Sequence, residues 1–192
     1  MKQQLNSEFW NNRYLQNDTG WDIGAPSPAL VLYAETFPPD TSILIPGCGN
    51  AYEAAYLLQK GFTGITLLDI SPALTASVAE KLKDYPVNIV TGDFFEHSGA
   101  YDLILEQTFF CALDPSLREA YVQKMHSLLK PGGQLAGLLF NRSFDGGPPF
   151  GGSVFEYENL FNNLFSLIKM EPARNSIPQR AGSEVFFIAR RK

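Results

Sequence analysis

The sequence has few of the residues that cross-link small proteins or bind metals in them. Its 192 residues include two cysteines, Cys48 and Cys111, and two histidines, His97 and His126. Two cysteines do not make a disulfide framework, which favours a reducing compartment, so a cytoplasmic location is expected. These four residues show no zinc-binding spacing, and we expect no metal.

The chain also lacks an excess of basic residues and any long apolar run. Its 15 lysines and arginines stand against 20 aspartates and glutamates, which gives a formal net charge of −5. Nucleic-acid binding requires a basic face, so no such partner is expected. The N-terminus is polar and no apolar run approaches the roughly 18 residues of a membrane span, so we expect neither a signal peptide nor a membrane partner. A monomer is expected.

The sequence does contain a strand, a glycine turn, a helix and a second strand between Ile43 and Asp69. The turn carries Gly47 and Gly49, which permit tight backbone conformations and a close approach by a ligand. Asp69 ends the second strand, where an acid can hydrogen-bond the hydroxyls of a ribose. A dinucleotide-binding turn would have a third glycine, but Tyr52 occupies that position. The pattern indicates a nucleoside without a pyrophosphate, such as S-adenosylmethionine, although any α/β protein can contain a glycine-rich turn.

A second acid follows a strand at Asp93. It comes after the predicted strand 87–90, and Phe94 is the next residue. The carboxylate could accept a hydrogen bond from an adenine amine while the Phe94 ring packs against the base. A solvated loop aspartate is the alternative interpretation.

The order of the elements predicts an α/β fold. Helices separate most of the expected strands, and the last two, with no helix between them, should pair as an antiparallel hairpin. We therefore predict one Rossmann-like, mostly parallel sheet with helices on both faces, in a single domain of residues 1–192. The expected strands cover residues 41–45, 65–68, 87–90, 101–105, 134–140, 166–170 and 184–189, and the expected helices cover residues 6–16, 29–36, 51–59, 73–83, 115–129 and 155–165.

An aromatic arm, residues 1–40, precedes the first strand. It contains Trp10, Tyr14 and Trp21, which include both tryptophans of the chain. A short helix is expected near its start, with Ser7 as the N-cap. The aromatic side chains could simply dock the arm onto the domain, or they could form a lid over a ligand.

Segments that follow the later strands are expected to shape a second part of the site. Residues 106–113 are apolar and could line the crevice or continue the core, and the Gly/Pro-rich residues 141–152 include Phe150. Arg118, Arg142 and Arg180 could attract an anionic substrate, although a surface arginine is the commoner case.

Motifs along nearly the whole chain resemble the thiopurine S-methyltransferase family of class I S-adenosylmethionine-dependent methyltransferases, and within it the plant-type thiol and halide methyltransferases. The motifs are FWNNRY, GW, LIPGCG, LLDIS, GDFF, FFCALDPSLREAY, LLKPGG, GGPPF and NSIPQRAG. The resemblance implies a seven-stranded sheet of order 3-2-1-4-5-7-6 with an antiparallel last strand, a helical N-terminal lid, and S-adenosylmethionine as the cofactor. It also implies cofactor contacts at Trp10, Tyr14, Trp21, Gly47, Asp69, Asp93, Phe94 and Gln107.

Three positions depart from the family pattern. Tyr14 stands where the family usually has Trp, Gln107 where the two branches have Tyr or Arg, and Phe140 where plant-type members have Tyr near the substrate. The substrate-pocket candidates are therefore Phe140, Phe150, Arg142 and Arg180.

The expected reaction is an in-line methyl transfer to a small thiol or thiolate, sulfide, thiocyanate or halide. Such nucleophiles are wholly or partly anionic near pH 7 and need no strong base. The alternatives are a thiopurine-type aromatic thiol as acceptor, a nicotinamide-dependent oxidoreductase that uses the same glycine turn, and a cofactor-binding protein without catalysis.

Overall fold

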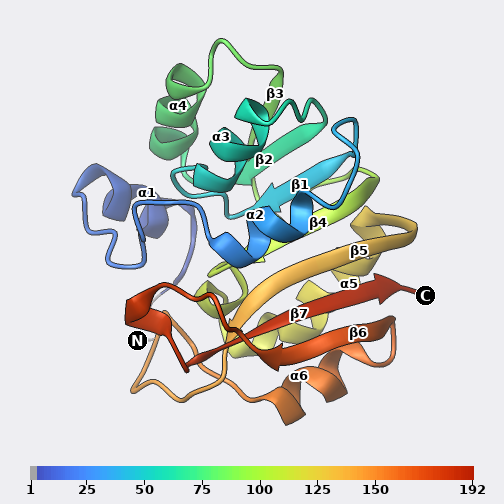
Figure 1. Cartoon of the computed structure of the whole chain (residues 1–192). Helices are drawn as coiled ribbons and strands as arrows, with labels where there is room; N and C mark the ends of the chain where they lie inside the picture. The colour runs from blue at the N-terminus through green and yellow to red at the C-terminus, as the bar shows by residue number, and fades with distance from the viewer. Residues whose placement is uncertain (1–3) are drawn as a thin grey trace.

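A single mixed sheet runs through the computed structural model, which describes residues 4–192 (Figure 1). The strands are β1 (Ile43–Pro46), β2 (Ile65–Asp69), β3 (Val87–Thr91), β4 (Tyr101–Gln107), β5 (Leu129–Phe140), β6 (Phe165–Pro172) and β7 (Glu184–Arg191). The helices are α1 (Ser7–Leu15), α2 (Pro28–Ala34), α3 (Tyr52–Gln59), α4 (Pro72–Lys81), α5 (Arg118–Leu128) and α6 (Val154–Phe161). Three 3₁₀ turns are η1 (Phe110–Ala112), η2 (Pro115–Leu117) and η3 (Pro178–Arg180).

The strand order is β3-β2-β1-β4-β5-β7-β6, which confirms the predicted order. β1 to β5 pair in parallel, whereas β7 lies antiparallel between β5 and β6. The two last strands form the expected hairpin, with only the short turn η3 between them.

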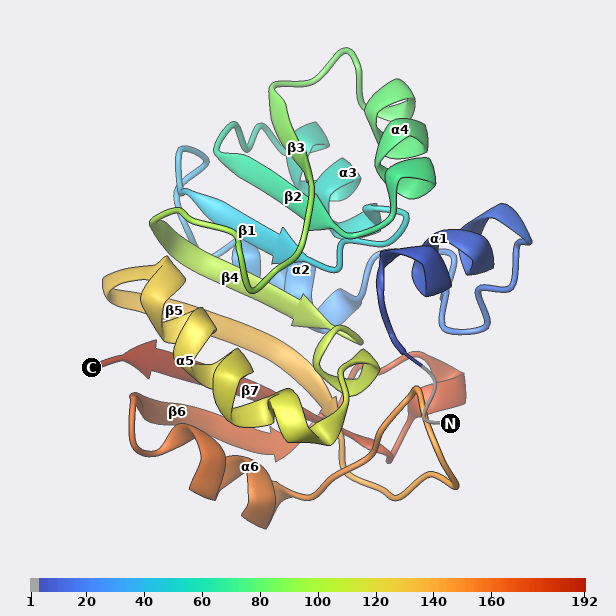
Figure 2. The same cartoon turned by 180° about the vertical axis from the view of Figure 1, so that it is seen from behind.

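Helices cover both faces of the sheet, as Figures 1 and 2 show from opposite sides. Successive residues of β1 point to opposite faces: Ile43 and Ile45 pack with α3 and α4, while Leu44 packs with α5 and α6. Both faces are therefore buried, which explains why the central strands are continuous apolar runs. Helix α1 lies apart, beyond the carboxyl ends of the parallel strands. No helix within residues 4–192 is long and apolar enough to cross a membrane.

The predicted N-cap of the first helix was wrong by one residue. Asn6 caps α1, since its side chain accepts a hydrogen bond from the Phe9 amide at 3.0 Å. The Ser7 hydroxyl instead donates to the Ile70 carbonyl at 2.8 Å, just beyond β2. The serine thus ties the arm to the sheet.

The region before β5 also differs from the prediction. The predicted helix 115–129 is the turn η2 followed by α5, and β5 begins at Leu129 rather than at Gln134. The pairing register of β4 and β5 shifts in this region, and Gly132 has a positive φ of 76°. The predicted glycine turn is therefore present as an irregularity at the start of the strand.

Candidate functional site

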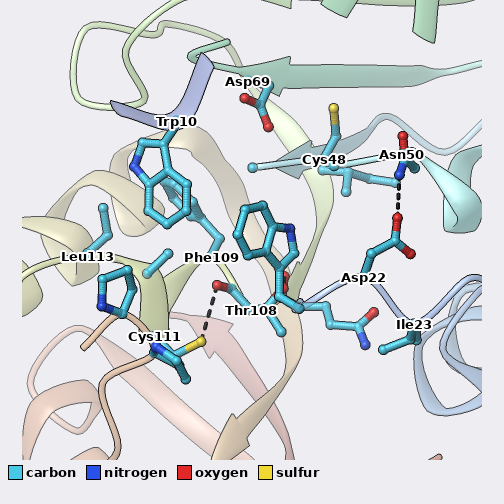
Figure 3. Close-up of a pocket in the computed structure, with 18 of the residues that line it drawn as sticks. Trp10, Asp22, Ile23, Cys48, Asn50, Asp69, Thr108, Phe109, Cys111 and Leu113 are labelled. Carbon is cyan, nitrogen blue, oxygen red and sulfur yellow. Dashed lines mark hydrogen bonds between the residues drawn. The ribbon is translucent and has the colours of Figure 1, made fainter. Parts of the chain in front are cut away.

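A cavity of about 600 Å³ opens at the carboxyl ends of the parallel strands, beneath the N-terminal arm (Figure 3). Ligands of open α/β sheets bind at this edge. The predicted site residues that line it are Trp10, Tyr14, Trp21, Gly47, Asp69, Asp93, Phe94, Gln107, Phe140, Arg142 and Arg180. Segments far apart in the sequence therefore meet at one place.

The glycine turn after β1 has left-handed backbone at two glycines. Gly47 has a φ of 57° and Gly49 a φ of 51°. A Cβ atom at Gly47 would lie 2.5 Å from Cδ2 of Phe109, which lines the cavity from beyond β4. Glycine is required here both by the backbone conformation and by this close packing.

Asp69 ends β2 with its side chain almost buried, at 7% relative exposure. Its Oδ1 accepts a hydrogen bond from the Ser71 amide at 3.0 Å. Burial raises the pKa of Asp69 from 3.8 to about 6, and hydrogen bonds from the backbone of Ser71, Gly49 and Ile70 oppose that rise. The carboxylate is thus mostly ionised at neutral pH and lines the cavity as an acceptor.

Asp93 and Phe94 come together after β3. Asp93 accepts a hydrogen bond from the Phe95 amide at 2.8 Å, and the Phe94 ring lies 5.0 Å from the Phe109 ring, centroid to centroid. Phe94 is a buried member of the core that also forms part of the cavity wall. Gln107, the last residue of β4, lines the same wall.

The arm both docks on the domain and faces the cavity. The Asn11 side chain accepts a hydrogen bond from the Ala73 amide at 2.9 Å, which ties α1 to the start of α4. The Trp21 ring packs edge-on against Trp10 at 5.5 Å and against Tyr14 at 5.7 Å, centroid to centroid. Burial, and then the charge of Asp69, raises the pKa of the Tyr14 hydroxyl. The two interpretations that the sequence left open are therefore compatible.

Aromatic and proline side chains form the other end of the cavity. Phe140, at the end of β5, packs edge-on against Phe144 at 5.0 Å, and both line the cavity together with Pro148 and Pro149. Phe150 does not belong to the cavity lining among residues 4–192, and its place in the substrate pocket stays a prediction. The 141–152 loop is irregular, and the sequence could not indicate which of its phenylalanines faces inward.

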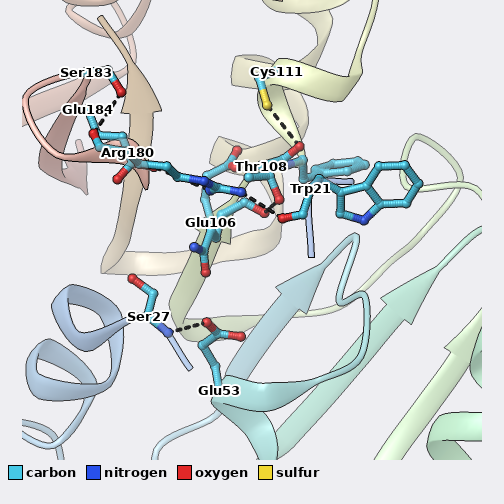
Figure 4. Close-up of polar contacts among 11 residues, drawn as sticks. Trp21, Ser27, Glu53, Glu106, Thr108, Cys111, Arg180, Ser183 and Glu184 are labelled. Atoms are coloured by element: carbon cyan, nitrogen blue, oxygen red, sulfur yellow. Dashed lines mark hydrogen bonds and ion pairs between the residues drawn. The ribbon is translucent and has the colours of Figure 1, made fainter. Parts of the chain in front are cut away.

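The three candidate arginines have different surroundings. The Arg180 side chain, 11% exposed, donates to the Trp21 carbonyl at 2.8 Å and lies 3.4 Å from a Glu184 oxygen (Figure 4). Arg142 is exposed, with its guanidinium 4.7 Å from the centre of the Phe144 ring.

Arg118 is not part of the cavity lining in the described chain, and attraction of an anionic substrate by this residue stays a prediction. Its guanidinium pairs with Glu156 and donates to the Gly151 carbonyl at 2.7 Å. Its role is to join the start of α5 to the start of α6.

One buried acid near the cavity, Glu106, was not recognised from the sequence as part of the site. Glu106 is completely buried in β4 and accepts hydrogen bonds from the Tyr121 hydroxyl at 2.5 Å and from the Phe109 and Phe110 amides at 3.1 and 3.0 Å. Burial raises the pKa of Glu106 to about 7. An acid inside the apolar run of residues 103–113 was the available signal.

Both cysteines line the cavity. Burial raises the pKa of the Cys111 thiol to about 12, and it raises the pKa of Cys48 as well. Neither is therefore a thiolate nucleophile at neutral pH.

Within residues 4–192, no group of three or more His, Cys, Asp or Glu side chains is arranged to hold a metal ion.

Named relatives align with most of this chain. The family model of thiopurine S-methyltransferase matches residues 5–187. A probable thiol methyltransferase 2 of Arabidopsis thaliana is 34% identical over 186 residues, which cover 91% of this chain and 81% of that protein. Thiocyanate methyltransferase 1 of Brassica oleracea is 31% identical over 184 residues, with the same coverage of 91% and 81%. A thiopurine S-methyltransferase of Vibrio atlanticus (strain LGP32) is 31% identical over 199 residues, covering 92% of this chain and 91% of that protein.

Solved structures share the fold. A 1,6-didemethyltoxoflavin-N1-methyltransferase of Burkholderia thailandensis with bound S-adenosylhomocysteine has a TM-score of 0.75 and 21% identity, covering 97% of this chain and 86% of that one. Magnesium protoporphyrin IX methyltransferase of Synechocystis PCC 6803 with bound S-adenosylmethionine also has a TM-score of 0.75, with 15% identity and coverage of 97% and 95%. The family match favours methyl transfer over the nicotinamide-dependent alternative. Because that match spans nearly the whole chain, the protein belongs to the thiopurine S-methyltransferase family and is an S-adenosylmethionine-dependent methyltransferase.

Proposed function

We propose that this protein methylates the sulfur of a small thiol or thiolate, and that residues 1–192 form one catalytic domain with residues 1–40 as its covering arm. The observation that carries the proposal is a single cavity with two chemically different ends. One end, at β1 to β3, has acids and the glycine turn, whereas the other, at β4 and β5, has aromatic rings and prolines. A nucleoside cofactor suits the first end and an apolar acceptor the second.

The residues of the first end fit S-adenosylmethionine. Asp69 is a buried carboxylate at a strand end and would accept hydrogen bonds from the ribose hydroxyls. Gly47, whose backbone lines the cavity without a side chain, would face the methionine part of the cofactor. Asp93 and Phe94 would hold the adenine, and Gln107 would contact the cofactor from β4.

Covering this end is the proposed role of Trp10, Tyr14 and Trp21, as a helical lid of the arm. Their three rings line the cavity and pack on one another. Aromatic rings above a bound cation also attract it through their π faces.

The chain contributes negative charge around the cofactor and excludes water from the acceptor. The bound cofactor supplies an electrophilic methyl group on a positively charged sulfur. Four acids line the cavity, Asp22, Glu53, Asp69 and Asp93, and they favour a cation there. The apolar walls exclude water from the nucleophile. Alignment of the nucleophile with the methyl group supplies much of the remaining rate acceleration. A thiol is partly ionised near pH 7, so no strong general base is required.

The surroundings of Arg180 favour a thiol over an inorganic anion. Its side chain is only 11% exposed, and its guanidinium is already paired with Glu184 and the Trp21 carbonyl. Thiocyanate or a halide would have to displace these partners to pair with Arg180, whereas an alkyl or aryl thiolate also binds through its apolar part. The rings of Phe109, Phe140 and Phe144 suit an alkyl or aryl thiol, which also keeps the thiopurine-type acceptor as the second candidate.

An acceptor panel tests this proposal. The protein is incubated with methyl-labelled S-adenosylmethionine and, separately, with thiophenol, bisulfide, thiocyanate and iodide. We expect kcat/KM to be highest for thiophenol and lowest for iodide. Methylation of none of the four while the cofactor still binds would refute the proposed acceptor class, and a preference for iodide or thiocyanate would refute the thiol assignment. The monomeric state, the cytoplasmic location and the lack of a nucleic-acid partner stay predictions.

A further inference from the structure

Two adjacent residues of the arm, Trp21 and Asp22, are held from opposite sides of the cavity. The Trp21 carbonyl accepts a hydrogen bond of 2.8 Å from Nη2 of Arg180, which lies 159 positions further along the chain (Figure 4). The Asp22 carboxylate accepts hydrogen bonds from the Asn50 side chain and, at 3.2 Å, from the Tyr52 hydroxyl (Figure 3 shows the Asn50 contact). The backbone of this dipeptide therefore crosses from η3 to the start of α3.

Each anchor is itself held in place. Arg180 is fixed by Glu184, at 3.4 Å, and its guanidinium lies 5.4 Å from the centre of the Phe140 ring. On the other side, the Lys81 ammonium donates to the Asn50 carbonyl at 2.8 Å and lies 4.7 Å from the centre of the Tyr52 ring. Side chains held by several partners lose little further entropy when they bind the arm.

The position of Tyr52 gives this arrangement a basis in the sequence. A dinucleotide-binding turn would have glycine there, and glycine has no side chain that could reach the arm. In this chain the position begins α3, right after the glycine turn, and its hydroxyl contacts Asp22. The residue that breaks the nucleotide-binding pattern is thus part of one of the two contacts that hold the Trp21–Asp22 dipeptide.

We propose that Asn50, Tyr52 and Arg180 are positioning residues that hold Trp21 and Asp22 across the cavity and so retain the cofactor beneath the arm. This inference rests on the proposed function, and it gives Arg180 a role through the arm rather than through direct contact with an anionic acceptor. Opening the cavity requires both fastenings to break. Weakening either one speeds release of the cofactor product.

The first test compares two tyrosines of α3. Tyr52→Phe removes the hydroxyl that contacts Asp22, whereas Tyr56→Phe removes a hydroxyl that contacts Glu35 at 2.8 Å rather than Trp21 or Asp22. Both tryptophans lie in the arm, so stopped-flow tryptophan fluorescence follows release of S-adenosylhomocysteine directly. We expect Tyr52→Phe to release it about 3- to 10-fold faster and Tyr56→Phe to stay within about twofold of the wild type. Equal rates for the two variants would overturn the fastening at Asp22.

The second test separates the two possible roles of Arg180. Arg180→Lys keeps the charge but loses the paired geometry with Glu184 and the Trp21 carbonyl. We expect faster S-adenosylhomocysteine release and a changed KM for the cofactor, with the acceptor KM changed little. A raised acceptor KM with unchanged release would show instead that Arg180 binds the acceptor.

Hydrogen exchange tests the two contacts that hold Trp21 and Asp22 independently of the proposed acceptor. In the ligand-free protein, amides of residues 17–27 should exchange faster in Tyr52→Phe and Arg180→Lys than in Tyr56→Phe. This holds whether or not any acceptor is methylated, so failure of the acceptor panel would refute the proposed acceptor and leave the fastening intact. Unchanged exchange in both variants would refute the fastening itself.

Discussion

Replacing Asp69 by Asn should weaken cofactor binding while it stabilises the ligand-free protein. Burial raises the pKa of this carboxyl from 3.8 to about 6, which corresponds to a cost of roughly 3 kcal/mol for holding the ionised form in the fold. Because the folded pKa lies above the unfolded one, the cost is absent below the unfolded value, where both states are protonated. It grows as the pH rises between the two values and is complete above about pH 6.

The amide of Asn is neutral and avoids the cost of burying a charge. It cannot accept all the backbone hydrogen bonds of the carboxylate, however, and this loss lowers the free energy of unfolding by about 1–2 kcal/mol. Ligand-free Asp69→Asn should therefore be about 1–2 kcal/mol more stable than the wild type at pH 8 and no more stable at pH 4. Affinity for S-adenosylhomocysteine should fall by about 1–3 kcal/mol, roughly 5- to 150-fold, because charge-assisted hydrogen bonds to the ribose are lost.

Urea denaturation at the two pH values measures the stability, and calorimetric titration measures the binding. Wild-type affinity should also decline as the pH falls through about 6, whereas the affinity of the variant should be flat there. A variant that binds S-adenosylhomocysteine as tightly as the wild type would remove Asp69 from the site. A variant that is less stable at pH 8 would refute the burial argument.

Three further predictions test other parts of the site. Gly47→Ala should lower the free energy of unfolding, measured by urea denaturation, by about 1–3 kcal/mol more than Gly182→Ala does. Both glycines have positive φ, but only Gly47 would place a Cβ against Phe109. Equal losses in the two variants would refute the clash. Tyr121→Phe should destabilise the protein by about 1–3 kcal/mol, and by more at pH 8 than at pH 6. Removing this hydrogen-bond donor raises the pKa of Glu106 further and leaves the ionised carboxylate with one hydrogen bond fewer. A loss that does not depend on pH would contradict this. Phe144→Ala should lower kcat/KM for thiophenol by about 5- to 30-fold with S-adenosylhomocysteine affinity unchanged, and an equal loss of both would place Phe144 at the cofactor.

The sheet was predictable because its signals are local. Central strands such as residues 43–45 are apolar throughout and are followed by helices, so their parallel orientation follows from a repeated strand–helix pattern, whereas the strand order was implied by the family resemblance. The position of Asp69 followed in turn, since the carboxyl end of a strand lies at the edge where ligands bind. Tyr52 could be recognised as a departure from the dinucleotide pattern, but its contact with Asp22 could not.

Contacts between segments far apart in the chain could not be predicted from the sequence. Arg118 pairs with Glu156 because α5 and α6 pack together, and nothing near Arg118 in the sequence reports that packing. In the 141–152 loop no periodicity distinguishes Phe144 from Phe150. The fastening of Trp21 by Arg180 joins the two ends of the chain and becomes visible only in the folded protein.

A crystal structure with S-adenosylhomocysteine bound tests the proposed site most directly. We predict that the ribose hydroxyls lie within hydrogen-bond distance of Asp69, that the adenine lies beside Asp93 and Phe94, and that the sulfur faces the aromatic end formed by Phe109 and Phe140. The arm should cover the ligand, with the Arg180 contact to Trp21 in place. A ligand bound elsewhere, or one in this cavity without contact to Asp69, would contradict the account.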